Sequence, residues 1–426
     1  MDVAKFSLDA SMEAIRAYED EIRDAWKAKK DGIPVAWTSV WGPYQLVIRA
    51  FGFPYIGVET CAEWFGRTRL TGGFTEEAER EGLVRDVCNF LTGPYGYLLA
   101  MKTLKPNELP WTTGFPDPDF TLEVNCLCDD QMKVFQNITR MKAKRAEPWH
   151  AYRIDVPFNV TGGNEDDVEQ TIVDYEVNQI REIIRKMEID TGVKLDEVRL
   201  ERTIDNANRM SAIGKEITEL RKTRPSPMAF LDAQVCVLDP MLNLLGTDRG
   251  VEVMQKALAE VKAKVADGTG VVEDEKIRLM WSNTPTWPNM GLFSYWHPSG
   301  VVFAFETNST SLRFHQGYKM DRNNPLETMC RKFLPHATNS DKGRTIKDRV
   351  DLIESYSIDG VVHSSNYGCR PYSLGEVDEL ISIREKKNVP QIIIDQDMTN
   401  EQFYDDRKIK TQIQALIEAI QTQKGI

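Results

Sequence analysis

The sequence has no stretch long enough to cross a membrane and no block of basic residues. No apolar run approaches the roughly 20 residues of a membrane-spanning helix, and the charged N-terminus lacks the apolar core of a secretion signal. The formal net charge is −12, from 53 Lys and Arg against 65 Asp and Glu. The sequence therefore has no basic stretch that would follow the phosphate backbone of a nucleic acid. We therefore expect a cytoplasmic protein that binds neither nucleic acid nor a membrane.

Several catalytic signatures are also missing. There is no G-x-G-x-x-G or Walker A sequence, and so no signature of a dinucleotide or ATP site. A Ser-His-Asp hydrolase is not supported, because there is no G-x-S-x-G elbow and each of the five histidines is isolated. The C-x-C of Cys126 and Cys128 lacks the second close pair that would identify a zinc ribbon.

What is present is the composition and pattern of an α/β protein. A chain of 426 residues predicts two or three domains at roughly 100 to 200 residues each. Strand-like stretches alternate with helical ones, which predicts parallel sheets flanked by helices. The strand-like stretches are "IPVAWTSVWGP", "FPYIGVE", "FTLEVN", "HAYRIDVPFN", "KIRLMWS", "GVVFAFETNS", "IDGVVHSS" and "VPQIIID".

This alternation is interrupted by a long helical region. Apolar residues from Val173 to Met187 and from Leu200 to Leu220 recur at helical spacing, which predicts two long helices packed as an antiparallel pair. The predicted fold is two Rossmann-like parallel-sheet domains joined by a helical segment, with an N-terminal helix. The expected boundaries are 1–30 for the N-terminal helical segment, 31–162 for the first α/β domain, 163–270 for the connecting segment and 271–426 for the second α/β domain.

The seven cysteines are the residues most open to a chemical interpretation. An odd, scattered set in a large cytosolic chain argues against a disulfide framework and leaves burial, catalysis or metal ligation. Ligands of open parallel sheets bind at the carboxyl ends of the strands, where Cys128 follows "FTLEVN" and Cys369 follows "IDGVVHSS". Each also precedes a predicted helix, whose N-terminus favours a thiolate. Simple burial remains the alternative. We expect it for Cys236, whereas Cys330 in "LETMCRKF" fits either the core or a surface helix.

Longer stretches of the chain resemble a known family. The segment 358–420, containing "NYGCRPYS" and "IIIDQD" before a terminal helix, resembles the C-terminal end of the family of benzoyl-CoA reductases and (R)-2-hydroxyacyl-CoA dehydratases. The resemblance continues upstream through "EREGLVRDVCNF", "LEVNCLCDDQMKVF", "YRIDVPFN" and "RPSP", so it covers most of the chain.

The resemblance implies a [4Fe-4S] cluster held by three cysteines. Carried over by position, these are Cys88, Cys128 and Cys369. In that family one iron stays open, and the cluster transfers one electron to the carbonyl of an acyl-CoA to give a ketyl radical anion. The implied partners are a homologous second cluster-binding subunit, an ATP-hydrolysing [4Fe-4S] activator protein, and ferredoxin or flavodoxin as the electron source.

The resemblance also supplies candidates for proton transfer. Glu59 in "GVETCAEW" matches a family glutamate near the substrate, although a surface or helix-capping role stays open. Thr38 and Ser39 carry hydroxyls at a comparable site after the first strand and are weaker candidates.

Two branches of the family fit the sequence. "EKIRLMWSNTPTW" and "NNPLETM" resemble the larger cluster-binding subunit of benzoyl-CoA reductases, which favours dearomatising reduction of an aromatic acyl-CoA. The stretch "ETCAEWFGRTRLTGG" departs from the dehydratase pattern of a His and small residues after the Glu. A 2-hydroxyacyl-CoA dehydratase subunit and a non-catalytic electron-relay subunit remain the alternatives.

Overall fold

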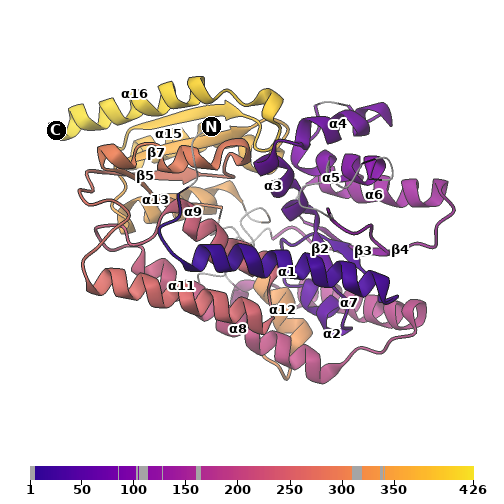
Figure 1. Ribbon diagram of the computed structural model, residues 1–426. Coiled ribbons are helices and arrows are strands. Elements are labelled where there is room, and N and C mark those ends of the chain that lie inside the picture. The colour runs from indigo at the N-terminus through magenta and orange to yellow at the C-terminus, as the bar shows by residue number, and fades with distance from the viewer. Residues whose placement is uncertain are drawn as a thin grey trace.

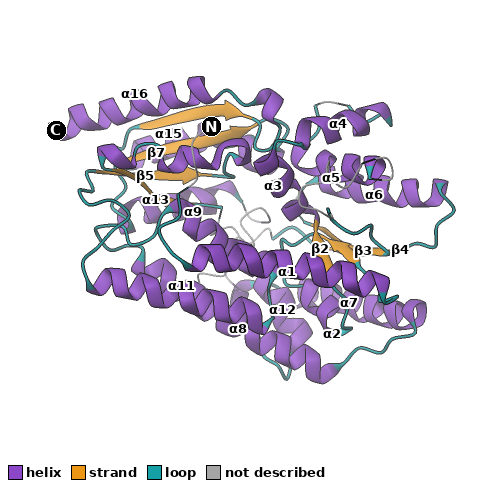
Figure 2. Cartoon of the chain, in the orientation of Figure 1, coloured by secondary structure: helices purple, strands orange, loops and turns teal. Residues whose placement is uncertain are grey.

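The structure contains two separate parallel sheets, each covered by helices (Figure 1). It is a computed structural model that describes residues 5–84, 86–101, 104, 114–126, 128–159, 165–308, 319–335, 339 and 341–426. Each sheet has four strands, and helices surround the strands of both sheets (Figure 2). The prediction of two Rossmann-like parallel-sheet domains with an N-terminal helix is confirmed.

The first sheet is built by the N-terminal part of the chain and has the strand order β2-β1-β3-β4. All of its neighbouring strands are parallel. Successive side chains alternate between its two faces, as the pleat requires: Trp37 and Ile56 belong to one hydrophobic cluster, Ala36 and Tyr55 to another. The elements are α1 (Ala10–Lys30), β1 (Ala36–Thr38), α2 (Gln45–Ala50), β2 (Tyr55–Gly57), α3 (Val58–Thr68), α4 (Thr71–Arg80), α5 (Asn89–Ala100), β3 (Phe120–Asn125), α6 (Asp129–Lys144) and β4 (His150–Asp155).

The second sheet has the strand order β6-β5-β7-β8 and is also fully parallel. Helix α16 covers one face, where Ile413 and Ile417 pack with Trp281. The other face carries Met280 with α13 and α15. The elements are β5 (Ile277–Ser282), η4 (Trp287–Ser294), η5 (His297–Ser299), β6 (Val301–Glu306), α12 (Pro325–Phe333), α13 (Lys342–Ser355), β7 (Gly360–Asn366), α14 (Arg370–Ser373), α15 (Glu376–Lys386), β8 (Gln391–Gln396), η8 (Glu401–Phe403) and α16 (Asp406–Lys424).

The two sheets share one topology. In each, the second strand lies on one side of the first and the third strand on the other, so the direction of winding reverses between the first and third strands. Connections diverge at such a switch point and leave a crevice at the carboxyl ends of the strands, where ligands bind. The chain therefore has two equivalent places for a ligand, one at β1 and β3 and the other at β5 and β7.

Helices connect the two sheets, and one prediction about them is wrong. In the described residues α8 packs against α11 and α2, while α7 packs against α12 and β4, so the two long helices do not pair with each other. Asp196 starts α8 by accepting a hydrogen bond from the backbone N–H of Arg199. The elements are η2 (Glu165–Asp167), α7 (Gln170–Thr191), α8 (Glu197–Leu220), α9 (Phe230–Ala233), the π-helix η3 (Gln234–Leu238), α10 (Asp239–Asn243) and α11 (Asp248–Ala266).

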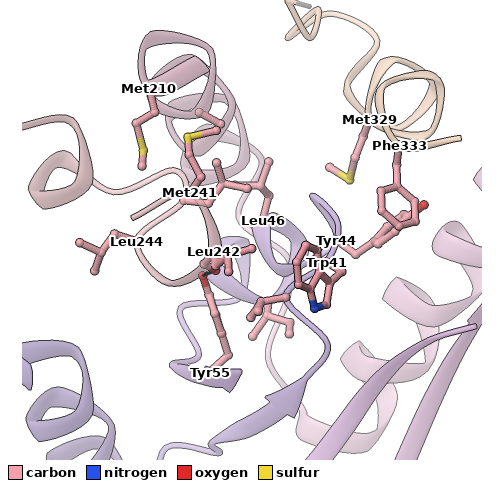
Figure 3. Close-up of a cluster of buried hydrophobic side chains, with 14 of the residues drawn as sticks. Trp41, Tyr44, Leu46, Tyr55, Met210, Met241, Leu242, Leu244, Met329 and Phe333 are labelled. Carbon is pink, nitrogen blue, oxygen red and sulfur yellow. Dashed lines mark hydrogen bonds between the residues drawn. The ribbon is translucent and has the colours of Figure 1, made fainter. Parts of the chain in front are cut away.

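The largest hydrophobic cluster joins these helices to the first sheet. Figure 3 shows part of it, where side chains of α2, α8, α10 and α12 meet. Tyr44 lies edge-on to Phe333 with 5.2 Å between ring centroids, so α12 is held next to the loop after β1. None of the helices in the described part of the chain has the length and hydropathy to cross a bilayer.

Candidate functional site

Three cysteines each lie immediately before the first residue of a helix. Cys88 is the N-cap of α5, Cys128 of α6 and Cys369 of α14. The N-terminal turn of a helix offers free backbone N–H groups and a partial positive charge, both of which favour an anionic sulfur. The helix-start positions expected for Cys128 and Cys369 are observed, and Cys88 occupies the same kind of position.

The three thiols approach one another across the boundary between the two sheets. Gly368 lies so close to Cys88 that a Cβ built on it would be 3.1 Å from the Cys88 Cα atom, which brings the neighbouring Cys369 to the same place. Burial raises the pKa of the Cys128 thiol to about 11 and that of Cys369 to about 12. The pKa of Cys88 is also raised, first by burial and then by the charges of Cys369 and Cys128. At neutral pH the three groups are therefore thiols, and keeping them as thiolates requires a cationic group that compensates their charges.

These cysteines line a cavity of about 60 Å³ whose walls are mostly apolar. An apolar lining lowers the local dielectric constant and so strengthens electrostatic interactions inside the cavity. The lining residues are Trp41, Glu59, Cys88, Phe90, Leu91, Cys128, Gln131, Thr284, Cys369, Pro371, Tyr372 and Met398.

Glu59 contributes a carboxyl group to this cavity, and it is buried with 1% of its surface exposed. Its Oε1 atom accepts hydrogen bonds from Ser39 Oγ at 2.7 Å and Gln131 Nε2 at 2.6 Å. Its Oε2 atom accepts one from the backbone N–H of Val40 at 3.1 Å. Burial raises the pKa of Glu59, and the hydrogen bonds partly oppose this. A fixed carboxyl with a raised pKa can hold a proton at a defined place.

Thr38 has a different environment from Ser39. Its hydroxyl donates to the carbonyl oxygen of Leu122 in β3 at 2.7 Å, and Thr38 is not among the described residues that line the cavity. The structure therefore brings Ser39 and Glu59 together and leaves Thr38 within the sheet.

The residues that follow the cysteines join the two halves of the site. Asn89 donates from Nδ2 to Asp397 Oδ2 at 2.7 Å, and both residues are buried. Arg370 forms ion pairs with Asp129 at 2.8 Å and with Asp130 at 3.2 Å. Each contact links an element of the first sheet to one of the second, so the two crevices form one site.

The other cysteines have different surroundings. Cys236 and Cys330 are fully buried in the largest hydrophobic cluster. This burial was expected for Cys236, and it places Cys330 in the core rather than on a surface helix. Cys61 is buried on α3. Cys126 is half-buried and packs against the largest cluster.

No three His, Cys, Asp or Glu side chains among the described residues are arranged to hold a single metal ion. A four-iron cluster makes a different demand, because each of its cysteines binds a different iron and the ligands stand farther apart. The donor set fits such a group in its chemistry: one buried and two half-buried thiols at helix starts, with mostly apolar walls.

Sequence reasoning missed most of the supporting residues. Gln131 lies three residues after Cys128 on the same helix, and that spacing would have identified it. Asn89, Arg370 and Asp397 lie in motifs that carry the family resemblance, but their pairing could not be predicted, because each partner is more than 200 residues away.

The chain is similar in sequence to known proteins over most of its length. The family model described as "2-hydroxyglutaryl-CoA dehydratase, D-component" matches residues 45–420. The chain is 24% identical to the B subunit of benzoyl-CoA reductase from Thauera aromatica, covering 93% of this chain and 91% of that protein. It is also 24% identical to the (R)-2-hydroxyisocaproyl-CoA dehydratase alpha subunit of Clostridioides difficile, with 96% and 95% covered. A third relative, the alpha subunit of lactoyl-CoA dehydratase from Anaerotignum propionicum, is 25% identical, with 94% and 93% covered. The chain is thus similar both to a benzoyl-CoA reductase subunit and to acyl-CoA dehydratase subunits. As the resemblance predicted, it belongs to the family of 2-hydroxyglutaryl-CoA dehydratase D-components.

Proposed function

We propose that this chain is the [4Fe-4S]-binding subunit of a radical enzyme that acts on acyl-CoA thioesters. The observation that carries the proposal is the placement of Cys88, Cys128 and Cys369 at three helix starts around one buried cavity. Three thiol ligands leave one iron of a cluster open. When bound, the cluster supplies one-electron transfer and an open position for the thioester carbonyl oxygen.

The chain's own residues would then orient the substrate and move a proton. Glu59 is fixed by Ser39, Val40 and Gln131, and its raised pKa suits a group that gives up a proton inside the cavity. The hydroxyl of Ser39 also bonds to Gln131, which completes a network that keeps the carboxyl in place.

We further propose the benzoyl-CoA reductase type of reaction, a dearomatising reduction of an aromatic acyl-CoA. Trp41, Phe90 and Tyr372 line the cavity and give it flat apolar surfaces that suit an aromatic ring. No histidine is among the described residues that line this cavity, in keeping with the departure from the dehydratase pattern after Glu59. An ATP-hydrolysing activator and a ferredoxin or flavodoxin would supply the electrons.

The second candidate is a 2-hydroxyacyl-CoA dehydratase subunit. The family description and two of the relatives named above favour it. An electron-relay subunit that holds the cluster but no substrate is a third alternative, and it would show a cluster spectrum that does not change when an acyl-CoA is added.

The first experiment tests the ligand set. The chain is purified without oxygen together with its partner subunit, and iron content and EPR spectra are compared for Cys88→Ala, Cys128→Ala and Cys369→Ala. Cys126→Ala serves as the matched control, since it removes a thiol two residues from Cys128. We expect the three variants to lose the [4Fe-4S] signal and the control to keep it; full clusters in all three would disprove the assignment.

The second experiment separates the two reactions. The parent enzyme, with activator and ATP, is assayed with benzoyl-CoA and with a 2-hydroxyacyl-CoA. Turnover of the aromatic substrate supports the reductase proposal, and turnover of the hydroxy substrate alone replaces it with the dehydratase.

A further inference from the structure

Helix α3 carries its three charged side chains along one face. Glu59, Glu63 and Arg67 follow one another at intervals of four residues, which places them one above the other on the same side of the helix. We call them the α3 row. The helix packs against β2 of the first sheet and against η4 beside the second, so it lies between the two sheets (Figure 1). The row spans about 12 Å at 1.5 Å per residue, and its first member, Glu59, lines the cavity of the three cysteines.

Glu63, in the middle of the row, is buried with 1% of its surface exposed. Its Oε2 atom lies 3.8 Å from Nη2 of Arg67, and the same nitrogen lies 3.3 Å from Oδ2 of Asp239 in α10. The charge of Glu59 acts on Glu63 from the other end of the row, and the hydroxyl of Tyr18 in α1 faces both Glu63 and Asp239. One guanidinium group therefore serves two carboxyl groups that are largely removed from water.

A single positive charge compensates only one of these two carboxylates. Burial raises the pKa of both groups. Asp239 is the better stabilised anion, because it lies closer to Arg67 and also accepts a hydrogen bond from Gln234 Nε2 at 2.9 Å. The charge of Asp239 then raises the pKa of Glu63 further. Glu63 is thus the group that holds a proton at neutral pH.

The far end of the α3 row reaches a second cavity, separate from that of the cysteines. This cavity has a volume of about 330 Å³ and is lined by Arg67, whose guanidinium lies 4.9 Å from the ring centroid of Trp287. Ile15 and Met290 also line it and are partly exposed, so the cavity opens to solvent. Water can therefore reach the Arg67 end of the row.

A smaller cavity lies between this opening and Glu63. Its volume is about 10 Å³, and Tyr18, Arg67 and Asp239 contribute polar groups to its walls. This size and these three groups suit one water molecule. The hydroxyl of Tyr18 is buried and has no hydrogen-bond partner among the described residues, so it is available to such a water. The polar groups thus continue from the solvent-filled opening to Glu63.

We propose that Glu63 relays protons from solvent at Arg67 to Glu59 in the cavity of the cysteines. Residues four apart on a helix have Cβ atoms about 5–6 Å apart, a span that two glutamate side chains bridge directly or through one water. Glu63 does not touch the substrate and acts only through Glu59. The walls of the cysteine cavity are mostly apolar, so a proton used there is replaced along the row.

This inference rests on the proposed function, because dearomatising reduction adds one proton to the ring for each electron. When Glu59 gives its proton to the substrate, its O–H bond breaks and a C–H bond forms. The carboxylate left on Glu59 takes the proton of Glu63, and Glu63 takes one from water at the Arg67 end. The electron comes from the ferredoxin or flavodoxin through the activator. One electron and one proton therefore enter together, and the charge of the site is unchanged after each step.

Infrared spectroscopy tests whether Glu63 holds a proton. Difference spectra between the parent enzyme and Glu63→Gln at neutral pH, in H₂O and in D₂O, isolate the C=O stretch of a protonated Glu63. We expect a band that is present in the parent, shifts in D₂O and is missing from the variant. If there is no such band, Glu63 is ionised and the relay is refuted. The measurement needs no turnover, so failure of the relay and failure of the proposed function are separate results.

Turnover of benzoyl-CoA tests whether this proton is used. Glu63→Gln should keep the iron content, the EPR signal and KM of the parent and lower kcat about 10²-fold or more. Glu123→Gln is the matched control, because Glu123 is also 1% exposed and pairs with Arg153 outside the row; it should keep the parent's kcat. An unchanged kcat in Glu63→Gln would overturn the proposal.

Chemical rescue separates a relay from a structural role. Formate should restore part of the turnover of Glu63→Ala, because a small carboxylic acid can occupy the space left by the side chain and carry the proton. Chloride at the same ionic strength should restore none. Glu63→Asp, which keeps a carboxyl group, should retain more turnover than Glu63→Gln. A loss in Glu63→Ala that formate does not restore, together with equal losses in Glu63→Asp and Glu63→Gln, would assign Glu63 a structural role and overturn the relay.

Discussion

Replacing Gly368 by alanine should damage the site by moving Cys369 away from Cys88. Gly368 has a φ angle of +74°, a backbone conformation that costs a residue with a Cβ about 1–2 kcal/mol. The added Cβ would also lie 3.1 Å from the Cα of Cys88 and 3.2 Å from its backbone nitrogen. Both atoms belong to the backbone and cannot rotate away, so the two loops must separate by a few tenths of an ångström.

Gly32 provides a matched control for this substitution. Its φ angle is +76°, and a Cβ built on it meets no atom within 4 Å. Gly32→Ala therefore carries the same backbone cost without the contact at Cys88. Each variant should lose about 1–2 kcal/mol of stability from the φ angle. Gly368→Ala should lose more than Gly32→Ala because of the contact at Cys88, and only Gly368→Ala should disturb the cluster.

The assay is iron content and EPR intensity per chain after anaerobic purification, with thermal denaturation measured in parallel. We expect Gly368→Ala to lose most of its iron and Gly32→Ala to keep the parent's content. If Gly368→Ala retains a full cluster and melts like Gly32→Ala, the approach of the two loops does not control the site, and the reasoning from this contact fails.

Three further predictions concern two single carboxyl groups and one buried ion pair. Glu59→Gln should keep the full cluster and lower turnover about 10²- to 10⁴-fold, as expected for loss of a proton-transferring group; unchanged kcat would exclude Glu59 from that role. Arg221→Met removes the buried cation paired with Glu306 at 2.6 Å and should cost about 3–5 kcal/mol of unfolding free energy, most of it recovered in the double variant with Glu306→Gln. Burial raises the pKa of Glu176 from 4.5 to about 7, so the folded chain keeps a proton that the unfolded chain releases, and stability falls as the pH rises through this range. The parent chain should lose about 3 kcal/mol of unfolding free energy between pH 4.5 and 7, and Glu176→Gln should remove this loss. The measurement is denaturation of parent and variant at several pH values; the same pH dependence in both would contradict the prediction.

The strands could be predicted from the sequence because each depends mainly on its own residues. "FTLEVN" and "IRLMWS" are short and almost entirely buried on both faces, as strands of a parallel sheet must be. "FTLEVN" is also rich in β-branched and aromatic residues. The positions of Cys128 and Cys369 followed from the same pattern, since ligands of parallel sheets bind where strands end and helices begin.

What the sequence could not predict depends on contacts between distant segments. The periodicity of α7 and α8 correctly indicated two long helices. Periodicity shows which face of a helix is apolar but not which element covers that face, and α8 packs against α11 rather than α7. Cys88 follows a helix rather than a strand, so no local rule marks it. Its place in the site depends on the close approach of Gly368 and on the hydrogen bond from the neighbouring Asn89 to Asp397. Gly368 and Asp397 both come from the far end of the chain.

The repeated topology explains why the candidate site needs both halves of the chain. In each sheet the third strand ends in an asparagine, Asn125 or Asn366, and the third residue after it is a cysteine that begins a helix. Cys128 and Cys369 are thus equivalent positions of two folds with one strand order, as expected if one α/β domain was duplicated. Cys88 lies between the second and third strands of the first sheet and makes the arrangement asymmetric. The first half holds two of the three proposed ligands and the second half holds one, so neither half alone could bind the cluster.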